Sequence, residues 1–142
     1  MKHLLITISI LLFISGCETT DDADNSEVFN TLLGSWGHAI PPSYCVEIYV
    51  FESNGNWSAA SLDEISAGNF TLNENASTER HSLTMSITYD NGLSDCLGVS
   101  SIDTGSSGTI YIEFPDPNTM EWYLYSTDST PSATLTKGSS NP

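Results

Sequence analysis

The chain has 142 residues and a formal net charge of −15 at pH 7, with 18 acidic residues against three lysines and arginines. Its length fits a single domain and leaves no room for a second hydrophobic core. Such a negative charge argues against a nucleic-acid-binding protein, and it favours a cation or a basic protein as partner. A simpler explanation is that it keeps the protein soluble.

The first residues predict where the protein resides. Lys2 and His3 precede an apolar run over residues 4–13, which is too short to span a bilayer as a permanent helix. The run leads into Ile-Ser-Gly-Cys at positions 14–17. This segment resembles the lipobox of bacterial lipoprotein precursors, which implies cleavage before Cys17 and a lipid on its thiol. We therefore expect an anchor in the cell envelope, at the outer membrane or the periplasmic face. The alternative is an ordinary signal peptide with a chance cysteine.

The mature chain divides into a tether, a domain and a tail. We expect a signal peptide over 1–16, a lipidated acidic tether over 17–26, the folded domain over 27–138 and a disordered tail over 139–142. Ser26 is a suitable N-cap for a short helix, and Gly34 is suited to end it.

Beyond Trp36 the helical period gives way to short alternating runs separated by turn residues, which is typical of an all-β domain. The turns Asn54-Gly55 and Asn91-Gly92 supply the positive φ values that tight hairpins need. The fold we expect is a small antiparallel up-and-down barrel, or a meander, with a short N-terminal helix. The expected strands lie near 35–39, 44–52, 56–61, 66–73, 81–89, 93–100, 108–114, 119–126 and 132–137.

The alternation also predicts a core. Residues two apart point to the same face of a strand, so the apolar set of each run should face inward. The predicted core residues are Phe70, Leu72, Leu83, Met85, Ile87, Tyr89, Ile110, Ile112, Phe114, Met120, Trp122, Leu124 and Leu135.

Two cysteines, Cys45 and Cys96, remain once Cys17 carries lipid. An even pair in an oxidising compartment predicts a disulfide, which would close a loop of about 50 residues. A redox or metal-binding pair is the alternative, but the sequence lacks a Cys-x-x-Cys spacing and a nearby group of histidines.

Gly34-Ser35-Trp36, at the start of the first strand, is similar to the Gly-x-Trp signature of lipocalins and of smaller lipocalin-like bacterial domains. The resemblance implies that Trp36 closes one end of the barrel and that Lys137 on the last strand packs across it. It further implies a small apolar ligand at the barrel mouth. A generic sandwich or open meander, with Trp36 merely filling its core, is the alternative.

Little in the sequence suggests catalysis. After the signal segment only His38 and His81 remain as histidines, and no nucleophile elbow, zinc-protease helix or phosphate loop is present. Asp90-Asn91-Gly92 with Asp95 fits a turn better than a calcium loop. We expect no enzymatic activity, no cofactor and no metal.

The outer face of the expected hairpin over 108–126 carries tyrosines beside glutamates. Tyr111 should lie opposite Tyr123, and Glu113 opposite Glu121, all on the solvent side. Two like charges across a strand pair are destabilising, and a cationic partner would relieve them. Together with Tyr125 these residues form a predicted docking patch for a basic protein; a favourable tyrosine pair with solvated glutamates is the simpler interpretation.

The leading hypothesis is therefore a membrane-anchored, non-catalytic envelope lipoprotein that binds a small apolar ligand. The alternative is an acidic protein-binding module, such as an inhibitor of, or assembly factor for, a basic envelope protein. The salt dependence of binding should distinguish the two hypotheses, because a rise in ionic strength weakens the docking of a basic protein and barely affects the binding of an apolar ligand.

Overall fold

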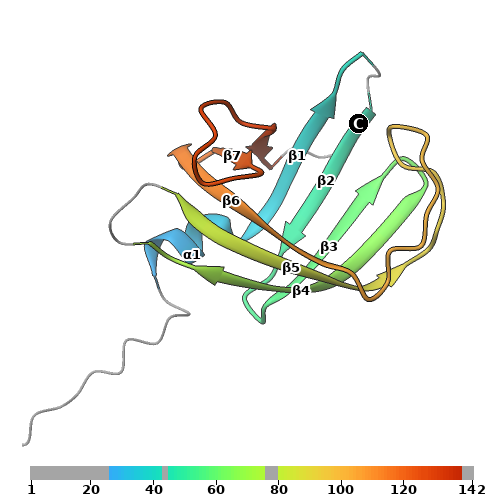
Figure 1. Cartoon of the computed structure of the whole chain (residues 1–142), viewed down its shortest axis with the longest axis horizontal. Coiled ribbons are helices and arrows are strands. Elements are labelled where there is room, and N and C mark those ends of the chain that lie inside the picture. The colour runs from blue at the N-terminus through green and yellow to red at the C-terminus, as the bar shows by residue number, and fades with distance from the viewer. Residues whose placement is uncertain (1–25, 43–44, 76–79, 139–142) are drawn as a thin grey trace, which may run out of the picture.

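The computed structural model describes residues 26–42, 45–75 and 80–138. In this part of the chain one short helix precedes eight strands that close into an antiparallel barrel, each strand pairing with the next and the last with the first (Figure 1). The all-β, up-and-down barrel predicted from the sequence is confirmed, and closure leaves no free sheet edge. The elements are α1 Glu27–Leu32, β1 Gly34–Ile40, β2 Cys45–Phe51, β3 Asn56–Ser61, β4 Glu64–Asn73, β5 His81–Asp90, β6 Ser107–Asp116, β7 Thr119–Tyr123 and β8 Ala133–Lys137.

Helix α1 begins as the sequence predicts. The Ser26 side chain accepts a hydrogen bond from the Phe29 amide at 2.9 Å, which satisfies one of the free N–H groups of the first turn. Gly34 then leads the chain into β1 with a φ of +110°, a backbone conformation that suits glycine alone. The helix thereby lies at one end of the barrel, with Phe29 and Leu32 buried.

Large apolar side chains occupy the barrel interior. Five predicted core residues are buried: Phe70, Leu83, Ile112, Met120 and Leu135. Six more pack against them while partly exposed: Leu72, Met85, Ile87, Ile110, Phe114 and Trp122. Residues from α1, β1, β2 and β3 complete the same cluster: Phe29, Leu32, Trp36, Phe51, Trp57 and Ala59. The core is therefore built from α1 and all eight strands.

The prediction of burial is wrong for two core residues, Tyr89 and Leu124. Tyr89 is 54% exposed because the pairing of β4 with β5 slips between Ala67 and Gly68, so that Thr88 is an extra residue and the alternation of faces is interrupted. Leu124 is 59% exposed because β7 already ends at Tyr123.

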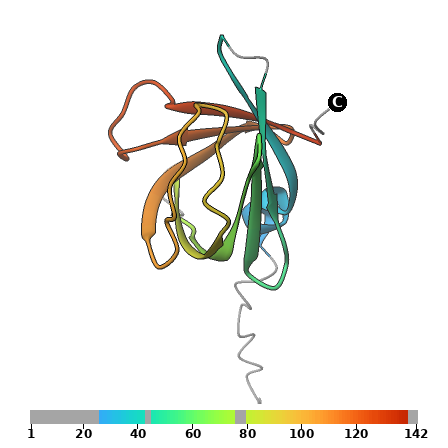
Figure 2. The same ribbon diagram turned by 90° about the vertical axis from the view of Figure 1, so that its right-hand side faces the viewer.

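The predicted strand over 93–100 is also wrong, because this segment belongs to a long loop between β5 and β6 that contains a single bridge, Ser94 to Ser100. The Asp95 side chain accepts hydrogen bonds from the amides of Leu97 and Val99, and Gly98 adopts a φ of +78°. These local bonds fold the segment into a turn instead of a strand. The loop and α1 lie at opposite ends of the barrel in Figure 1, and Figure 2 shows the molecule from the loop end.

Candidate functional site

Trp36 and Lys137, the pair that the lipocalin resemblance implies, lie together at the end of the barrel next to α1. The Trp36 ring is fully buried, and its indole N–H donates to the carbonyl of Leu32 at 2.7 Å. The Lys137 ammonium lies 5.2 Å from the centre of that ring and donates to the carbonyl of Thr31 at 2.7 Å. A residue of the last strand thus fixes the last turn of the helix over the core.

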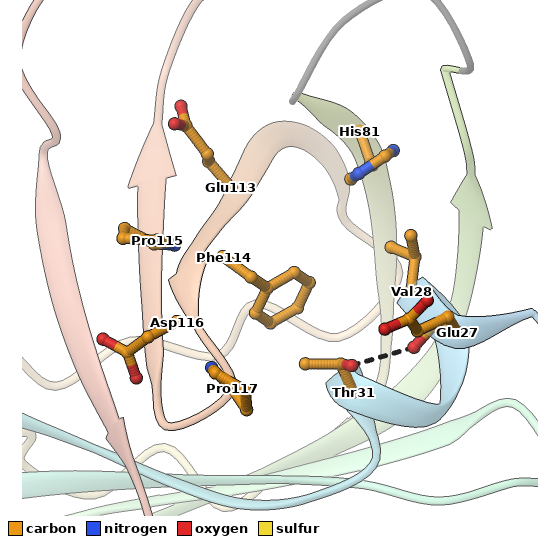
Figure 3. Close-up of a pocket in the computed structure, with 9 residues that line it drawn as sticks. All are labelled: Glu27, Val28, Thr31, His81, Glu113, Phe114, Pro115, Asp116 and Pro117. Atoms are coloured by element: carbon orange, nitrogen blue, oxygen red, sulfur yellow. Dashed lines mark hydrogen bonds between the residues drawn. The ribbon is translucent and has the colours of Figure 1, made fainter.

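An open pocket of about 480 Å³ lies on the same end, between α1, the start of β5 and the hairpin of β6 and β7 (Figure 3). Val28 and Phe114 provide apolar walls, and Figure 3 shows the Phe114 ring turned toward the helix. Glu27, Glu113 and Asp116 place carboxylates around it. The Asp116 carboxylate accepts a hydrogen bond from the Asn118 amide, which lowers the pKa of Asp116.

The two histidines lie apart. His81 lines this pocket and accepts a hydrogen bond from the Asn75 amide, whereas His38 lies in β1, where its ring contacts the carbonyl of Thr134 at 3.1 Å. Over residues 26–42, 45–75 and 80–138, no three His, Cys, Asp or Glu side chains gather in a way that could hold a metal ion.

The register of the predicted outer patch is confirmed, but its surroundings differ from the expectation. Tyr111 pairs with Tyr123 and Glu113 with Glu121, as predicted. Tyr123, however, is buried, because the guanidinium of Arg80 covers its ring at 3.6 Å.

The same arginine contacts the predicted charge pair. Its Nε lies 3.3 Å from Glu113, while Tyr123 donates to Glu121 at 2.6 Å. This hydrogen bond, with burial and the nearby carboxylates, raises the pKa of Tyr123. The cation expected from a partner is here supplied by the chain itself. Tyr125 remains 68% exposed, and docking of a basic protein at this patch stays a prediction.

The opposite end of the barrel, which we call the mouth, contains a polar cluster that we did not predict from the sequence. Glu47 lies on the face of β2 that also carries Tyr49 and Phe51, so its carboxylate points inward. It accepts hydrogen bonds from Tyr49 at 3.0 Å and from the buried Ser61 at 2.8 Å. The Ser61 hydroxyl oxygen in turn accepts from the Cys96 amide at 2.9 Å.

Tyr49 connects this cluster to Trp122. The two rings meet edge to face with their centres 4.8 Å apart. Burial, reinforced by the charge and the hydrogen bond of Glu47, raises the pKa of Tyr49 far above that of a solvated tyrosine. The buried indole N–H of Trp122 has no hydrogen-bond partner among the described residues. Such a group is costly to bury.

The predicted disulfide forms between Cys45 at the start of β2 and Cys96 in the loop between β5 and β6. It ties the loop to the rim of the mouth, where the amides of Asp63 and Glu64 both donate to the carbonyl of Ser94 at 3.1 Å. Burial and the nearby charges of Asp90, Asp95, Asp103 and Glu47 raise the pKa of Glu64. The mouth is therefore strongly negative.

Other predictions fall outside the described residues. These are the lipidation of Cys17, the signal peptide over 1–16, almost all of the tether over 17–26 and the tail over 139–142. Among the described helices, none is long and apolar enough to cross a membrane. Comparison with protein-family models, curated proteins and solved structures finds no match for this chain.

The sequence contained one signal for the mouth cluster that our interpretation did not use. Residues 45–51 are apolar apart from Glu47, and a period of two places Glu47 on the face of Cys45, Tyr49 and Phe51. A carboxylate on the inner face of a barrel strand indicates a polar site inside. Its partner Ser61 comes from β3, and Trp122, which contacts Tyr49, comes from β7, so no local pattern connects these residues to Glu47.

Proposed function

We propose that this chain is a membrane-anchored envelope lipoprotein whose non-catalytic, lipocalin-like barrel binds a small ligand at the mouth. The lipobox-like segment and the acidic tether support the anchor. The eight-stranded barrel, closed at one end by Trp36 and Lys137, supports the lipocalin-like domain.

The unpartnered indole N–H of Trp122 is the observation that carries the ligand site. An acceptor atom of a bound molecule would satisfy this N–H, and the ring faces of Tyr49 and Trp122 offer apolar contact. Because Glu47 and Glu64 contribute negative charge, the ligand is neutral or cationic.

The ligand is also small. Seven large side chains of the core are fully buried, and eight-stranded barrels have interiors that side chains can just fill. A ligand therefore occupies the mouth and does not reach the helix end. We assign it an apolar body with one hydrogen-bond acceptor.

Native mass spectrometry of the full chain, purified from the envelope of a bacterium that expresses it, tests the proposal. We expect a discrete extra mass that is lost on denaturation. Trp122→Phe, which keeps the aromatic contact and removes the N–H, reduces the bound fraction. Trp57→Phe is the matched control, because the Trp57 N–H already donates to the carbonyl of Ser86 at 3.1 Å.

An apo mass under all conditions, or a bound mass unchanged by Trp122→Phe, overturns the ligand site. The anchor has its own readout. The denatured mass shows cleavage before Cys17 with an added diacylglyceryl group, and Cys17→Ser moves the chain from the membrane fraction to the soluble fraction. Retention of the Cys17→Ser variant in the membrane contradicts lipid anchoring.

A further inference from the structure

The exposed apolar side chains of the described residues are concentrated at the loop end of the barrel. Seven of the nine large hydrophobic residues that are exposed lie on the loop between β5 and β6, on the turn between β3 and β4 or on the adjoining ends of β4 and β5. We call this set the loop-end face. It consists of Leu62, Ile65, Tyr89, Leu93, Leu97, Val99 and Ile102, with exposures between 52% and 74%.

Backbone contacts join these segments into one surface. The Asn91 amide donates to the carbonyl of Ile65 at 3.1 Å, and the Asn91 side chain accepts from the amides of Ile65 and Leu93. Tyr89 pairs with Ala67, two residues beyond Ile65 on β4. Gly92 lies so close to Ile102 that an added Cβ would approach its side chain to 2.8 Å. Ile65, Tyr89, Leu93 and Ile102 thus lie close together on a framework of backbone contacts.

The framework is also fixed in position. The Cys45–Cys96 disulfide and the Cys96-to-Ser61 hydrogen bond hold the middle of the loop to the barrel. A surface that is ordered in advance binds at a lower entropic cost than a flexible one. The exposed leucine, valine and isoleucine side chains are therefore presented in a fixed arrangement.

Carboxylates surround this apolar surface. Asp63 and Glu64 lie on the turn and at the start of β4, Asp90 at the end of β5, and Asp95 and Asp103 in the loop. Burial and the charges of Asp90, Asp95 and Asp103 contribute to the raised pKa of Glu64. The two bases that follow Cys17 in the sequence lie elsewhere: Arg80 is bound to Glu113, and Lys137 to Thr31.

We propose that the loop-end face docks a basic amphipathic segment of another protein, in which lysine or arginine side chains flank apolar ones. The apolar side chains of the partner cover the exposed leucine, valine and isoleucine residues, and its cations meet the surrounding carboxylates. Large exposed apolar patches rimmed by charge are typical of protein interaction sites. This surface lies outside the barrel, so the proposal goes beyond the ligand site and does not depend on it.

Charge decides against two other occupants. A second copy of the chain would bring the same ring of carboxylates against itself, and like charges opposed across an interface destabilise it. A bilayer with anionic headgroups is repelled for the same reason. The face also lies at the end of the barrel opposite α1, the helix that directly follows the proposed lipidated tether in the sequence.

The probe for the test is a synthetic peptide that alternates leucine and lysine, titrated into the full chain by fluorescence anisotropy, with a leucine–glutamate peptide as the chemical control. We expect binding of the lysine peptide alone. The affinity falls as salt rises from about 50 mM to about 300 mM, because the charge attraction is screened. Hydrogen exchange slows over residues 62–65 and 91–103 in the complex.

Two variants locate the surface. Leu97→Ser/Ile102→Ser removes apolar contact and weakens the affinity at least about tenfold. Asp63→Asn/Glu64→Gln removes charge, weakens binding and flattens its salt dependence. Matched controls lie elsewhere: Leu124→Ser removes an exposed leucine in another loop, and Glu27→Gln/Glu52→Gln removes two charges near the helix end. These controls leave the affinity within about twofold of the unchanged chain.

Several results overturn the proposal. If the lysine peptide does not bind, the loop-end face is not a docking site for such a segment. If the control variants weaken the affinity as much as the loop-end variants do, the peptide is attracted by net charge alone. Self-association of the chain that is lost in Leu97→Ser/Ile102→Ser, measured by sedimentation, assigns the surface to a second copy. Flotation of a Cys17→Ser chain with vesicles of phosphatidylethanolamine and phosphatidylglycerol assigns it to lipid.

Discussion

The guanidinium carbon of Arg80 lies 3.6 Å from the centre of the Tyr123 ring, and its Nε lies 3.3 Å from the Glu113 carboxylate. Arg80 also donates to the carbonyls of Ser126 and Asp128, which lie in the connection between β7 and β8. One arginine therefore shields an outward-facing tyrosine, neutralises part of the Glu113–Glu121 pair and fixes a loop. A surface that looks in the sequence like an unpartnered acidic patch is partly satisfied within the chain.

We predict that Arg80→Gln lowers the thermal midpoint by several degrees, because it uncovers Tyr123 and leaves Glu113 opposite Glu121 without a cation. Added salt should restore part of the loss by screening the two glutamates. Arg80→Lys, which keeps the charge and loses the planar stacking, is the matched control. Its thermal midpoint should lie between those of the unchanged chain and Arg80→Gln. A thermal midpoint that is unchanged in Arg80→Gln would show that these contacts do not stabilise the barrel.

The closure of the barrel by Lys137 leads to a second prediction. Lys137→Met keeps the aliphatic stem but removes the hydrogen bond to Thr31 and the contact of the ammonium with Trp36. We expect a loss of about 1–2 kcal/mol in the free energy of unfolding, measured in urea. Lys137→Arg should retain most of the stability. A methionine variant as stable as the unchanged chain would contradict a closing role for the lysine.

The disulfide provides a third prediction. Replacing Cys45 and Cys96 by serine opens a loop between positions 51 residues apart and should lower the free energy of unfolding by about 2–4 kcal/mol. Exchange of backbone amides should accelerate over residues 91–106, which the disulfide ties to the rim, and much less in α1 at the other end. Uniform acceleration would instead indicate that the disulfide stabilises the whole barrel and not the mouth in particular.

A fourth prediction follows from the raised pKa of Glu64. The folded chain binds the proton of the Glu64 carboxyl more tightly than the unfolded chain does. Protonation of Glu64 therefore stabilises the fold fully below the pKa of an unfolded glutamate, about 4.3, and this stabilisation is lost as pH rises through the folded pKa. Glu64→Gln, which cannot ionise, should therefore be more stable than the unchanged chain at pH 7, and the difference should shrink toward pH 4. Thermal unfolding at several pH values measures this, with Glu27→Gln as a control in α1. A difference that grows as pH falls would contradict the sign.

The bulge at Thr88 and the loop between β5 and β6 show where prediction from the sequence fails. The Thr88 bulge cannot be recognised locally, because it depends on how β5 pairs with β4, and it moves Tyr89 from the inside to the outside. The alternating run Leu93 to Ser100 resembles a strand, yet the hydrogen bonds of Asp95 with its own neighbours fold it into a turn. In both places a competing hydrogen-bond arrangement overrides the periodic pattern.

The sequence by itself determined the elements whose causes are local. The N-cap at Ser26, the Asn54-Gly55 turn, the inward set Leu83, Met85 and Ile87 and the pairing of two free cysteines all follow from a few neighbouring residues or from simple counting.

Tertiary structure alone decided the contacts between distant segments. Arg80 on Tyr123, Ser61 on Glu47 and Tyr49 against Trp122 each join residues from segments far apart in the sequence. Such contacts depend on the register in which the barrel closes, and a one-residue shift would turn every side chain of a strand to the other face. The positions of the eight strands were therefore visible in the sequence, together with a ninth strand that does not form, whereas the chemistry at the mouth and on the loop-end face depended on the closed barrel.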